Sequence, residues 1–216
     1  MPAGAEARWF VDFEQTGPDL DQTAMAGWHL PLPQDWEIAT DGANRVLRLA
    51  KSGPIGNPRR PVKFALWKAG CVSDFVSEVK MRRNDGSLLM AFGFQDRAHF
   101  YYAHVSRDDG DTRVHNGLFK VSGGERYRIG GAGSAPVLPT TRWHTVKVVR
   151  KAESGSIEVF VDGETEARFA VTDTSFQYGW VGLGSFDETG DFDDFRLTGT
   201  SSHHCEPAKL DPLDSE

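Results

Sequence analysis

The segment from Trp143 to Gly199 places the strongest constraint on how this chain can fold. It holds two stretches of alternating apolar and polar residues, Val146–Arg150 and Ile157–Val161, on either side of a Glu-Ser-Gly turn. Alternation with a period of two around a short turn containing glycine is typical of a β-hairpin. An Asp-Gly turn leads into another strand, and a glycine-punctuated strand and a final strand, Phe192–Leu197, follow. This part of the chain is therefore predicted to be antiparallel β-structure.

The remainder of the sequence repeats the same pattern, with short strands separated by turn residues and no sustained helical period. A single all-β domain commonly reaches about 200–250 residues, so the 216 residues suit one such domain. We predict a two-sheet antiparallel β-sandwich over residues 1–200, followed by a polar, flexible tail over residues 201–216. The earlier predicted strands are Trp9–Glu14, Trp36–Ile38, Val46–Ala50, Val62–Trp67, Phe75–Arg82, Ser87–Phe94, His99–Ser106, Gly117–Ser122 and Tyr127–Ile129.

Charge and hydropathy exclude some functions. The formal net charge is -7, which argues against nonspecific nucleic-acid binding because that binding depends on phosphate neutralisation by Lys and Arg. No apolar run approaches the ~20 residues that a membrane helix needs, and the segment Met1–Ala7 lacks the basic start and apolar stretch of a signal peptide. We expect no nucleic-acid partner, no membrane span and a monomer.

Three sequence elements carry a resemblance to a known superfamily. They are F-G-F-Q-D at 92–96, W-H-T-V-K-V at 143–148 and G-W-V-G-L-G at 179–184. These elements resemble the concanavalin A-like jelly rolls, which include laminin G-like domains, legume lectins, glucanases and polysaccharide lyases, and the 3-keto-disaccharide hydrolase-like proteins. The resemblance implies a polysaccharide or oligosaccharide partner and a secreted or periplasmic location. It does not indicate a reaction, because one fold hosts many functions.

The paired carboxylates that retaining glucanases of this fold carry on one strand are missing, so their mechanism is not expected. The densest polar and aromatic stretch runs instead from Phe92 to His104. By strand parity, Phe100, Tyr102 and His104 are assigned to the core, and Ala91, Gly93, Gln95, His99, Tyr101 and Ala103 to an exposed floor. Such a floor could lie beneath a sugar chain.

These residue types suit β-elimination on a uronate-containing polysaccharide, the chemistry of jelly-roll alginate lyases. A guanidinium or amide neutralises the sugar carboxylate, a histidine removes the proton, and a tyrosine protonates the leaving oxygen. The candidate catalytic residues are Gln95, His99, Tyr101 and His115, and the candidate substrate-binding residues are Arg59, Arg60, Asn116 and Lys120. Two alternatives stay open: a non-catalytic carbohydrate-binding module, and a glycoside hydrolase of the 3-keto-disaccharide type.

Two further features lie outside the floor. Glu14 and Asp194 point outward by parity on the first and last strands, so we predict that they help to hold a structural Ca²⁺, with a salt bridge from Asp194 to Arg196 as the alternative. Cys71 and Cys205 could form a disulfide that ties down the tail. Two unpaired thiols are the simpler interpretation, which the sequence favours.

Overall fold

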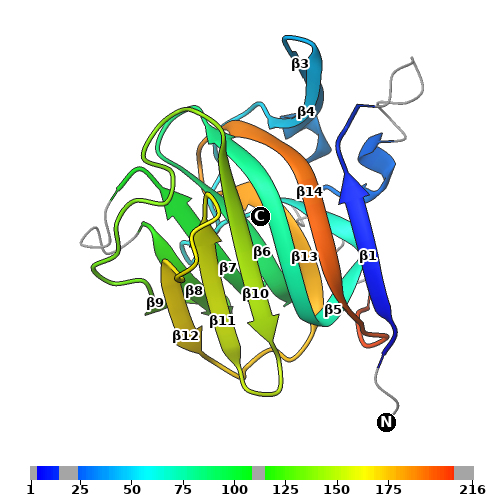
Figure 1. Cartoon of the computed structure of the whole chain (residues 1–216), viewed down its shortest axis with the longest axis vertical. Coiled ribbons are helices and arrows are strands. Elements are labelled where there is room, and N and C mark those ends of the chain that lie inside the picture. Colours follow the sequence, from blue (N-terminus) through cyan, green and yellow to red (C-terminus); the bar gives the residue numbers. More distant parts are fainter. Residues whose placement is uncertain (1–3, 15–23, 109–114, 207–216) are drawn as a thin grey trace.

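The computed structural model describes residues 4–14, 24–108 and 115–206, and these form two layers of antiparallel strands (Figure 1). The predicted all-β sandwich is confirmed. The strands are β1 (Glu6–Val11), β2 (Trp28–His29), β3 (Trp36–Asp41), β4 (Asn44–Leu49), β5 (Lys63–Arg83), β6 (Ser87–Asp96), β7 (His99–Ser106), β8 (Gly117–Ser122), β9 (Glu125–Gly130), β10 (His144–Lys151), β11 (Ser156–Val161), β12 (Phe169–Thr172), β13 (Gly179–Ser185) and β14 (Gly190–Ser201). A 3-10 turn, η1 (Pro33–Asp35), precedes β3.

The long strand β5 belongs to both layers. Its first residues pair with β13, and its later residues pair with β10 and β14. One layer, the front sheet, therefore has the order β12-β11-β10-β5-β14-β1, and the other, the back sheet, has the order β5-β13-β6-β7-β8-β9 (Figure 1). The hairpin of β3 and β4 extends from β14 at the upper end of the front sheet. No helix in the described ranges is long and apolar enough to cross a membrane.

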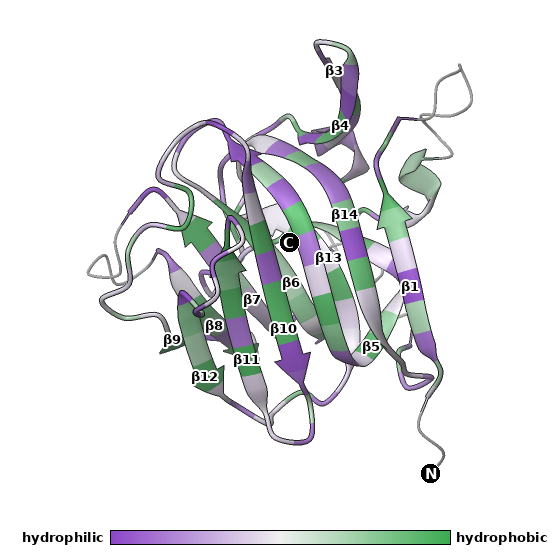
Figure 2. Cartoon of the chain, viewed as in Figure 1, coloured by the Kyte–Doolittle hydropathy of each residue, from purple (hydrophilic) through white to green (hydrophobic). Residues whose placement is uncertain are grey.

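The main core lies between the two sheets and follows the predicted alternation. In β10, Val146 and Val148 are buried, whereas Thr145, Lys147 and Val149 are half-buried. Figure 2 shows the resulting alternation of apolar and polar bands along β10 and β5. In β14 the strict alternation breaks: Phe192 and Phe195 are both fully buried in the core, because a bulge with Asp194 in the left-handed region (φ 49) inserts an extra residue. Strict parity would place Phe192 outward together with Asp194, and the bulge is the reason that it faces the core instead.

A second apolar cluster covers the outer face of the back sheet. It contains Phe94, Phe100 and Tyr102, together with Phe119 and Phe186. The strand register explains why the parity assignment was wrong. Phe92 pairs with Tyr101, and a bulge at Gly93 (φ 55) shifts the rest of β6. Tyr101 therefore packs with Phe92 between the sheets, while the predicted core residues of β7 face outward from the sandwich.

Cys71 and Cys205 form a disulfide with a Cα–Cα distance of 6.1 Å, so the expectation of two unpaired thiols was wrong. Ser201 ends β14, and the backbone N–H of Ser202 donates to the carbonyl of Cys71. The start of the predicted tail is thus attached to β5. Residues 207–216 of that tail lie outside the described residues. A disulfide is stable in an oxidising compartment, which agrees with the expected secreted or periplasmic location.

Candidate functional site

The predicted exposed floor does not form, and Tyr101 shows why. Its side chain is fully buried between the sheets. Its hydroxyl donates to Oδ1 of Asp173 over 2.5 Å and accepts a hydrogen bond from the backbone N–H of Phe176. Burial and the hydrogen bond to Asp173 raise the pKa of the Tyr101 hydroxyl to about 12. Tyr101 therefore joins the β12–β13 connection to the back sheet and does not contact the surface where a glycan could bind.

We therefore predict that Tyr101→Phe lowers stability and leaves glycan binding unchanged. The substitution leaves the buried N–H of Phe176 without its acceptor, and an unsatisfied buried group costs about 1–3 kcal/mol. Urea unfolding of the wild type and the variant measures the loss. If the variant had unchanged stability but reduced glycan binding, Tyr101 would belong to the binding site after all.

The other floor residues are also engaged within the protein, in separate places. The ring nitrogen Nδ1 of His99 lies 2.9 Å from Asp96, and the amide of Gln95 donates to the carbonyl of Tyr178. The ammonium of Lys120 forms an ion pair of 2.6 Å with Asp173. Burial opposes the ionisation of Asp173, but hydrogen bonds from Lys120, Ser175 and Tyr101 outweigh it and hold the pKa of this carboxyl below its ordinary value. Lys120 is thus a partner of a structural carboxylate.

Asn116, predicted to bind substrate, is fully buried and has a left-handed backbone (φ 53). Its Oδ1 accepts hydrogen bonds from the backbone N–H groups of Ser106 and Val137, and its Nδ2 donates to the carbonyl of Ala135. A buried amide with these partners satisfies the hydrogen-bonding groups of the backbone around it. Asn116 therefore supports this backbone, and its predicted substrate-binding role stays a prediction.

Two further predicted residues, Arg59 and His115, lie on the outer face of the back sheet. Guanidinium groups cover aromatic rings there. Arg126 lies over both Phe186 (4.9 Å) and Phe119 (5.3 Å), and Arg59 lies over Phe186 (5.0 Å). We call this the arginine-lined face; its members are Arg59, Arg126, Arg128, Tyr102, His104, His115, Phe119 and Phe186. The quadrupole of an aromatic ring attracts a cation placed over its face, and the cation keeps its charge. Arg59 also lies 3.8 Å from Asp187, and Arg128 donates to backbone carbonyls. Arg126 is therefore the main source of positive charge on this apolar base.

A tyrosine and two histidines extend this face. The ring of His104 lies 5.4 Å from that of His115, and Nδ1 of His115 lies 2.5 Å from Oδ2 of Asp108. Tyr102 is fully buried beneath the guanidinium groups, and burial raises the pKa of its hydroxyl in spite of the nearby charges of Arg126 and Arg59. Arg126 interacts with that hydroxyl, although no hydrogen bond of normal geometry reaches it within the described residues.

Arg60, the other predicted substrate-binding arginine, donates to the carbonyl of Pro58 in the loop beside this face. Arg126, Tyr102 and Phe186 were not among the predicted site residues. A usable signal was present in β9, where Arg126 and Arg128 alternate with Tyr127 and so share one side of the strand. The pairing of Arg126 with Val121 and of Arg128 with Phe119 places that side over the outer cluster.

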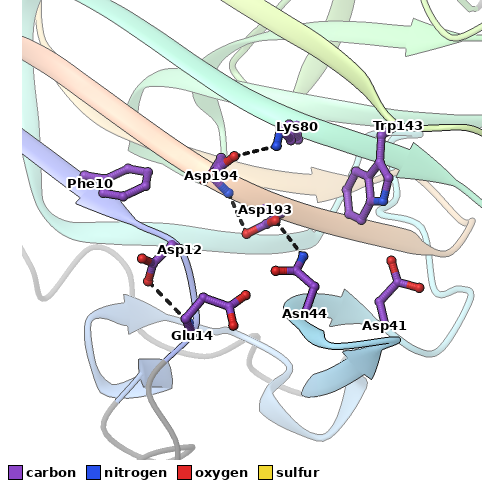
Figure 3. Close-up of a pocket in the computed structure, with 9 residues that line it drawn as sticks. All are labelled: Phe10, Asp12, Glu14, Asp41, Asn44, Lys80, Trp143, Asp193 and Asp194. Atoms are coloured by element: carbon purple, nitrogen blue, oxygen red, sulfur yellow. Dashed lines mark hydrogen bonds and ion pairs between the residues drawn. The ribbon is translucent and has the colours of Figure 1, made fainter.

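A separate cavity of about 480 Å³ lies at the upper end of the front sheet (Figure 3). We call it the acidic cavity; Phe10, Asp12, Glu14, Asp41, Asn44, Lys80, Trp143, Asp193 and Asp194 line it. Asp194 forms an ion pair of 2.7 Å with Lys80, and Asn44 donates to Asp193 over 2.9 Å. Asp193 is 5% exposed, and this burial raises the pKa of its carboxyl. Glu14, three residues after the end of β1, and Asp194 of β14 thus line the same cavity.

The calcium ion predicted from Glu14 and Asp194 stays a prediction. Among the described residues, no group of three His, Cys, Asp or Glu side chains is placed to hold a metal ion. Asp194 pairs with Lys80 at 2.7 Å and lies farther from Arg196, at 3.8 Å. A cation at this site would have to combine the two carboxylates with backbone carbonyl oxygens, which Ca²⁺ accepts.

We expect added Ca²⁺ to raise the melting temperature, because the carboxylates of the acidic cavity outnumber its one lysine and a ligand that binds the native state stabilises it. Thermal unfolding with Ca²⁺ and with a chelator measures the effect, and Glu14→Gln should remove it. Identical melting temperatures in both buffers would mean that ion pairs alone hold this cavity.

Comparisons with known proteins agree with the geometry of the fold. No protein-family model matches the chain, and no curated protein matches it in sequence. The carbohydrate-binding module CBM66 from Bacillus subtilis is similar in structure, with a TM-score of 0.56 at 18% identity over 79% of this chain and 94% of that one.

Two other structures are similar at lower identity. A protein from Bacillus subtilis with a galectin-like fold has a TM-score of 0.57 at 10% identity, covering 93% of this chain and 99% of that one. The acidic lectin of winged bean, in complex with methyl-α-D-galactose, has a TM-score of 0.55 at 12% identity, covering 91% and 99%. The chain thus has a jelly-roll β-sandwich fold, which these three structures share.

Proposed function

We propose that this protein binds carbohydrate, and that its ligand is a uronate-containing glycan held on the arginine-lined face. The observation that carries the proposal is the placement of Arg59 and Arg126 over Phe186 on the outer face of a lectin-like sheet. Guanidinium groups recognise carboxylates through paired hydrogen bonds. Within the described part of the chain, no carboxylate forms an ion pair with Arg126, so its charge can attract an acidic ligand even though the side chain contacts Tyr102 and two aromatic rings.

Structural similarity supports the carbohydrate part of this proposal. The carbohydrate-binding module from Bacillus subtilis and the galactose-bound winged bean lectin have the same fold as this chain. The arginine-lined face supports the acidic part, although the formal net charge of the whole chain is -7. A local group of cations sets the potential at its own surface, so an acidic protein can still bind an anionic chain there.

Elimination is a second candidate, because the same face also holds a histidine and a tyrosine. His115, with Nδ1 against Asp108, has the arrangement of a base that is oriented by a carboxylate. Tyr102 lies beside Arg126 and takes the role first given to Tyr101. In that reaction His115 would remove the proton next to the uronate carboxylate, and the C–O bond to the leaving sugar would break as Tyr102 protonates its oxygen. Full burial of Tyr102 favours binding without chemistry. The hydrolase alternative has no residues of its own here.

A panel of polysaccharides tests binding and both reactions together. We expect polygalacturonate or alginate to bind, measured by calorimetry, with an affinity that falls as salt screens the arginines. Neutral dextran should not bind to this face. Absorbance at the wavelength of unsaturated uronates detects elimination, and new reducing ends without absorbance detect hydrolysis. Failure of every uronate polymer to bind at low salt would refute the proposal.

A further inference from the structure

A second cavity, of about 910 Å³, lies at the other end of the front sheet from the acidic cavity, and we propose that it binds an uncharged saccharide. The two ends are separated by the length of β10: Trp143, next to its first residue, lines the acidic cavity, and Ala152, next to its last, lines this one. We call it the disulfide-walled cavity. Its lining comes from β5, the β10–β11 turn, the segment before β13 and the end of β14, which lie together at the lower end in Figure 1.

One wall is the segment 202–204, which the disulfide holds in place. Cys205 is bound to Cys71 of β5, and the N–H of Ser202 donates to the Cys71 carbonyl over 2.9 Å. The ring of His204 lies 5.1 Å from the ring of Tyr178, which faces it across the cavity lining. Tyr178 is in turn held through its backbone carbonyl, which accepts a hydrogen bond from the side-chain amide of Gln95. The two rings are therefore held by covalent and hydrogen-bonded supports before any ligand arrives.

The lining chemistry indicates the class of ligand. Two carboxylates, Asp74 and Glu153, and the amide of Gln177 offer acceptors and donors for hydroxyl groups, together with the hydroxyls of Ser73, Thr200, Ser201 and Ser202. An aromatic ring packs against the C–H face of a sugar, and the polar groups then fix its orientation. Asp74 uses one oxygen for the backbone N–H of Ala152, and its other oxygen lies 3.8 Å from the ammonium of Lys151. Glu153 has no ion pair among the described residues.

Charge separates this ligand from the one proposed for the arginine-lined face. Among the described residues that line the disulfide-walled cavity there is no Lys or Arg, and the nearby ammonium of Lys151 lies 3.8 Å from Asp74, so no unpaired Lys or Arg of this lining would neutralise a uronate. The two carboxylates would instead repel it, since like charges at close range are unfavourable. A neutral oligosaccharide, rich in hydroxyls, matches the lining. This inference does not rest on the proposed function, because the two sites share no residues.

Amide chemical shifts of the ¹⁵N-labelled protein test the inference with maltotriose, cellotriose and xylotriose at millimolar concentration. We expect at least one of them to shift the amides of Asp74, Glu153, Tyr178 and His204. Tyr178→Ala and Glu153→Gln should each weaken that binding at least tenfold. Both positions lie on the surface side of loops, so the variants should fold, and their spectra report it. Arg126→Ala is the control and should bind the neutral sugar normally.

Three results would overturn the inference. These are no shift with any of the three sugars, shifts that cluster elsewhere, and binding that Tyr178→Ala and Glu153→Gln leave unchanged. The paired substitution of Cys71 and Cys205 by Ser tests the wall separately: it should weaken neutral-sugar binding and leave uronate binding intact. Equal affinity for the neutral sugar with and without the disulfide would show that the segment 202–204 does not contribute to binding. If the wild-type protein bound a neutral sugar but no uronate, only the proposed function would be contradicted.

Discussion

Arg126→Ala is expected to weaken the binding of a uronate oligosaccharide by about 30-fold, which corresponds to ~2 kcal/mol. Arg126 is central to the arginine-lined face, because its guanidinium lies over both Phe119 and Phe186. It also lies beside the buried hydroxyl of Tyr102. Removing it deletes a charge and the planar fork that meets a carboxylate. Calorimetric titration of wild type and variant with the same oligosaccharide measures the change.

Two companion variants separate charge from geometry. Arg126→Lys keeps the positive charge but loses the paired donors and the flat stacking surface, so its affinity should lie between those of the wild type and Arg126→Ala. Arg142→Ala removes an exposed arginine on the side of the acidic cavity and should leave binding unchanged. Equal losses in Arg126→Ala and Arg142→Ala would indicate a general charge effect. An unchanged affinity in Arg126→Ala would show that the arginine-lined face does not hold the uronate.

The fold was predictable because its signals are local. The hairpin of β10 and β11 follows from alternation and a glycine-containing turn, and both strands contain the predicted segments. Trp9, Val11 and Phe13 also face the core as their shared parity predicts. Within regular strands, each residue fixes the side of the next, so the sequence pattern determines which side chains are buried.

The site was less predictable because it depends on register and on contacts between distant segments. Both faces of β6 and β7 are apolar and buried, so hydrophobicity could not identify the face between the sheets. The bulge at Gly93 then shifts one strand against the other. Arg59 and Arg126 meet over Phe186 only in the folded chain. The disulfide joins cysteines separated by 134 positions, and no local pattern encodes that approach.

The loop that carries Arg59 is anchored by a buried ion pair, which leads to the prediction with the largest effect on stability. Lys63 is fully buried, and its ammonium lies 2.7 Å from Oδ2 of Asp35 in η1. The same ammonium donates to the carbonyl of Lys51. It therefore closes the segment between Lys51 and Lys63, within which Arg59 reaches the outer face of the back sheet.

Asp35→Asn is expected to destabilise the protein by about 3–5 kcal/mol, because it leaves a buried ammonium without its counter-charge. For a chain of this length, each kcal/mol lowers the melting temperature by about 2–4 °C. Uronate affinity should fall as well, since the loop holding Arg59 loses its anchor. Thermal unfolding and calorimetric titration of the same preparation measure the two effects.

The size of this loss comes from the unpaired charge, so replacing both partners should restore most of the stability. Paired substitution of Asp35 by Leu and Lys63 by Met removes both charges and keeps apolar volume, a change that is often neutral in buried ion pairs. Glu6→Gln is the surface control: its ion pair with Arg8 is exposed on both sides, and such pairs contribute little.

If Asp35→Asn had the same melting temperature as the wild type, the Lys63 ammonium would have to find another partner. The anchoring of the Arg59 loop by Asp35 would then be disproved. If the paired variant recovered its melting temperature but not its uronate affinity, the ion pair would serve to position Arg59 rather than to stabilise the fold.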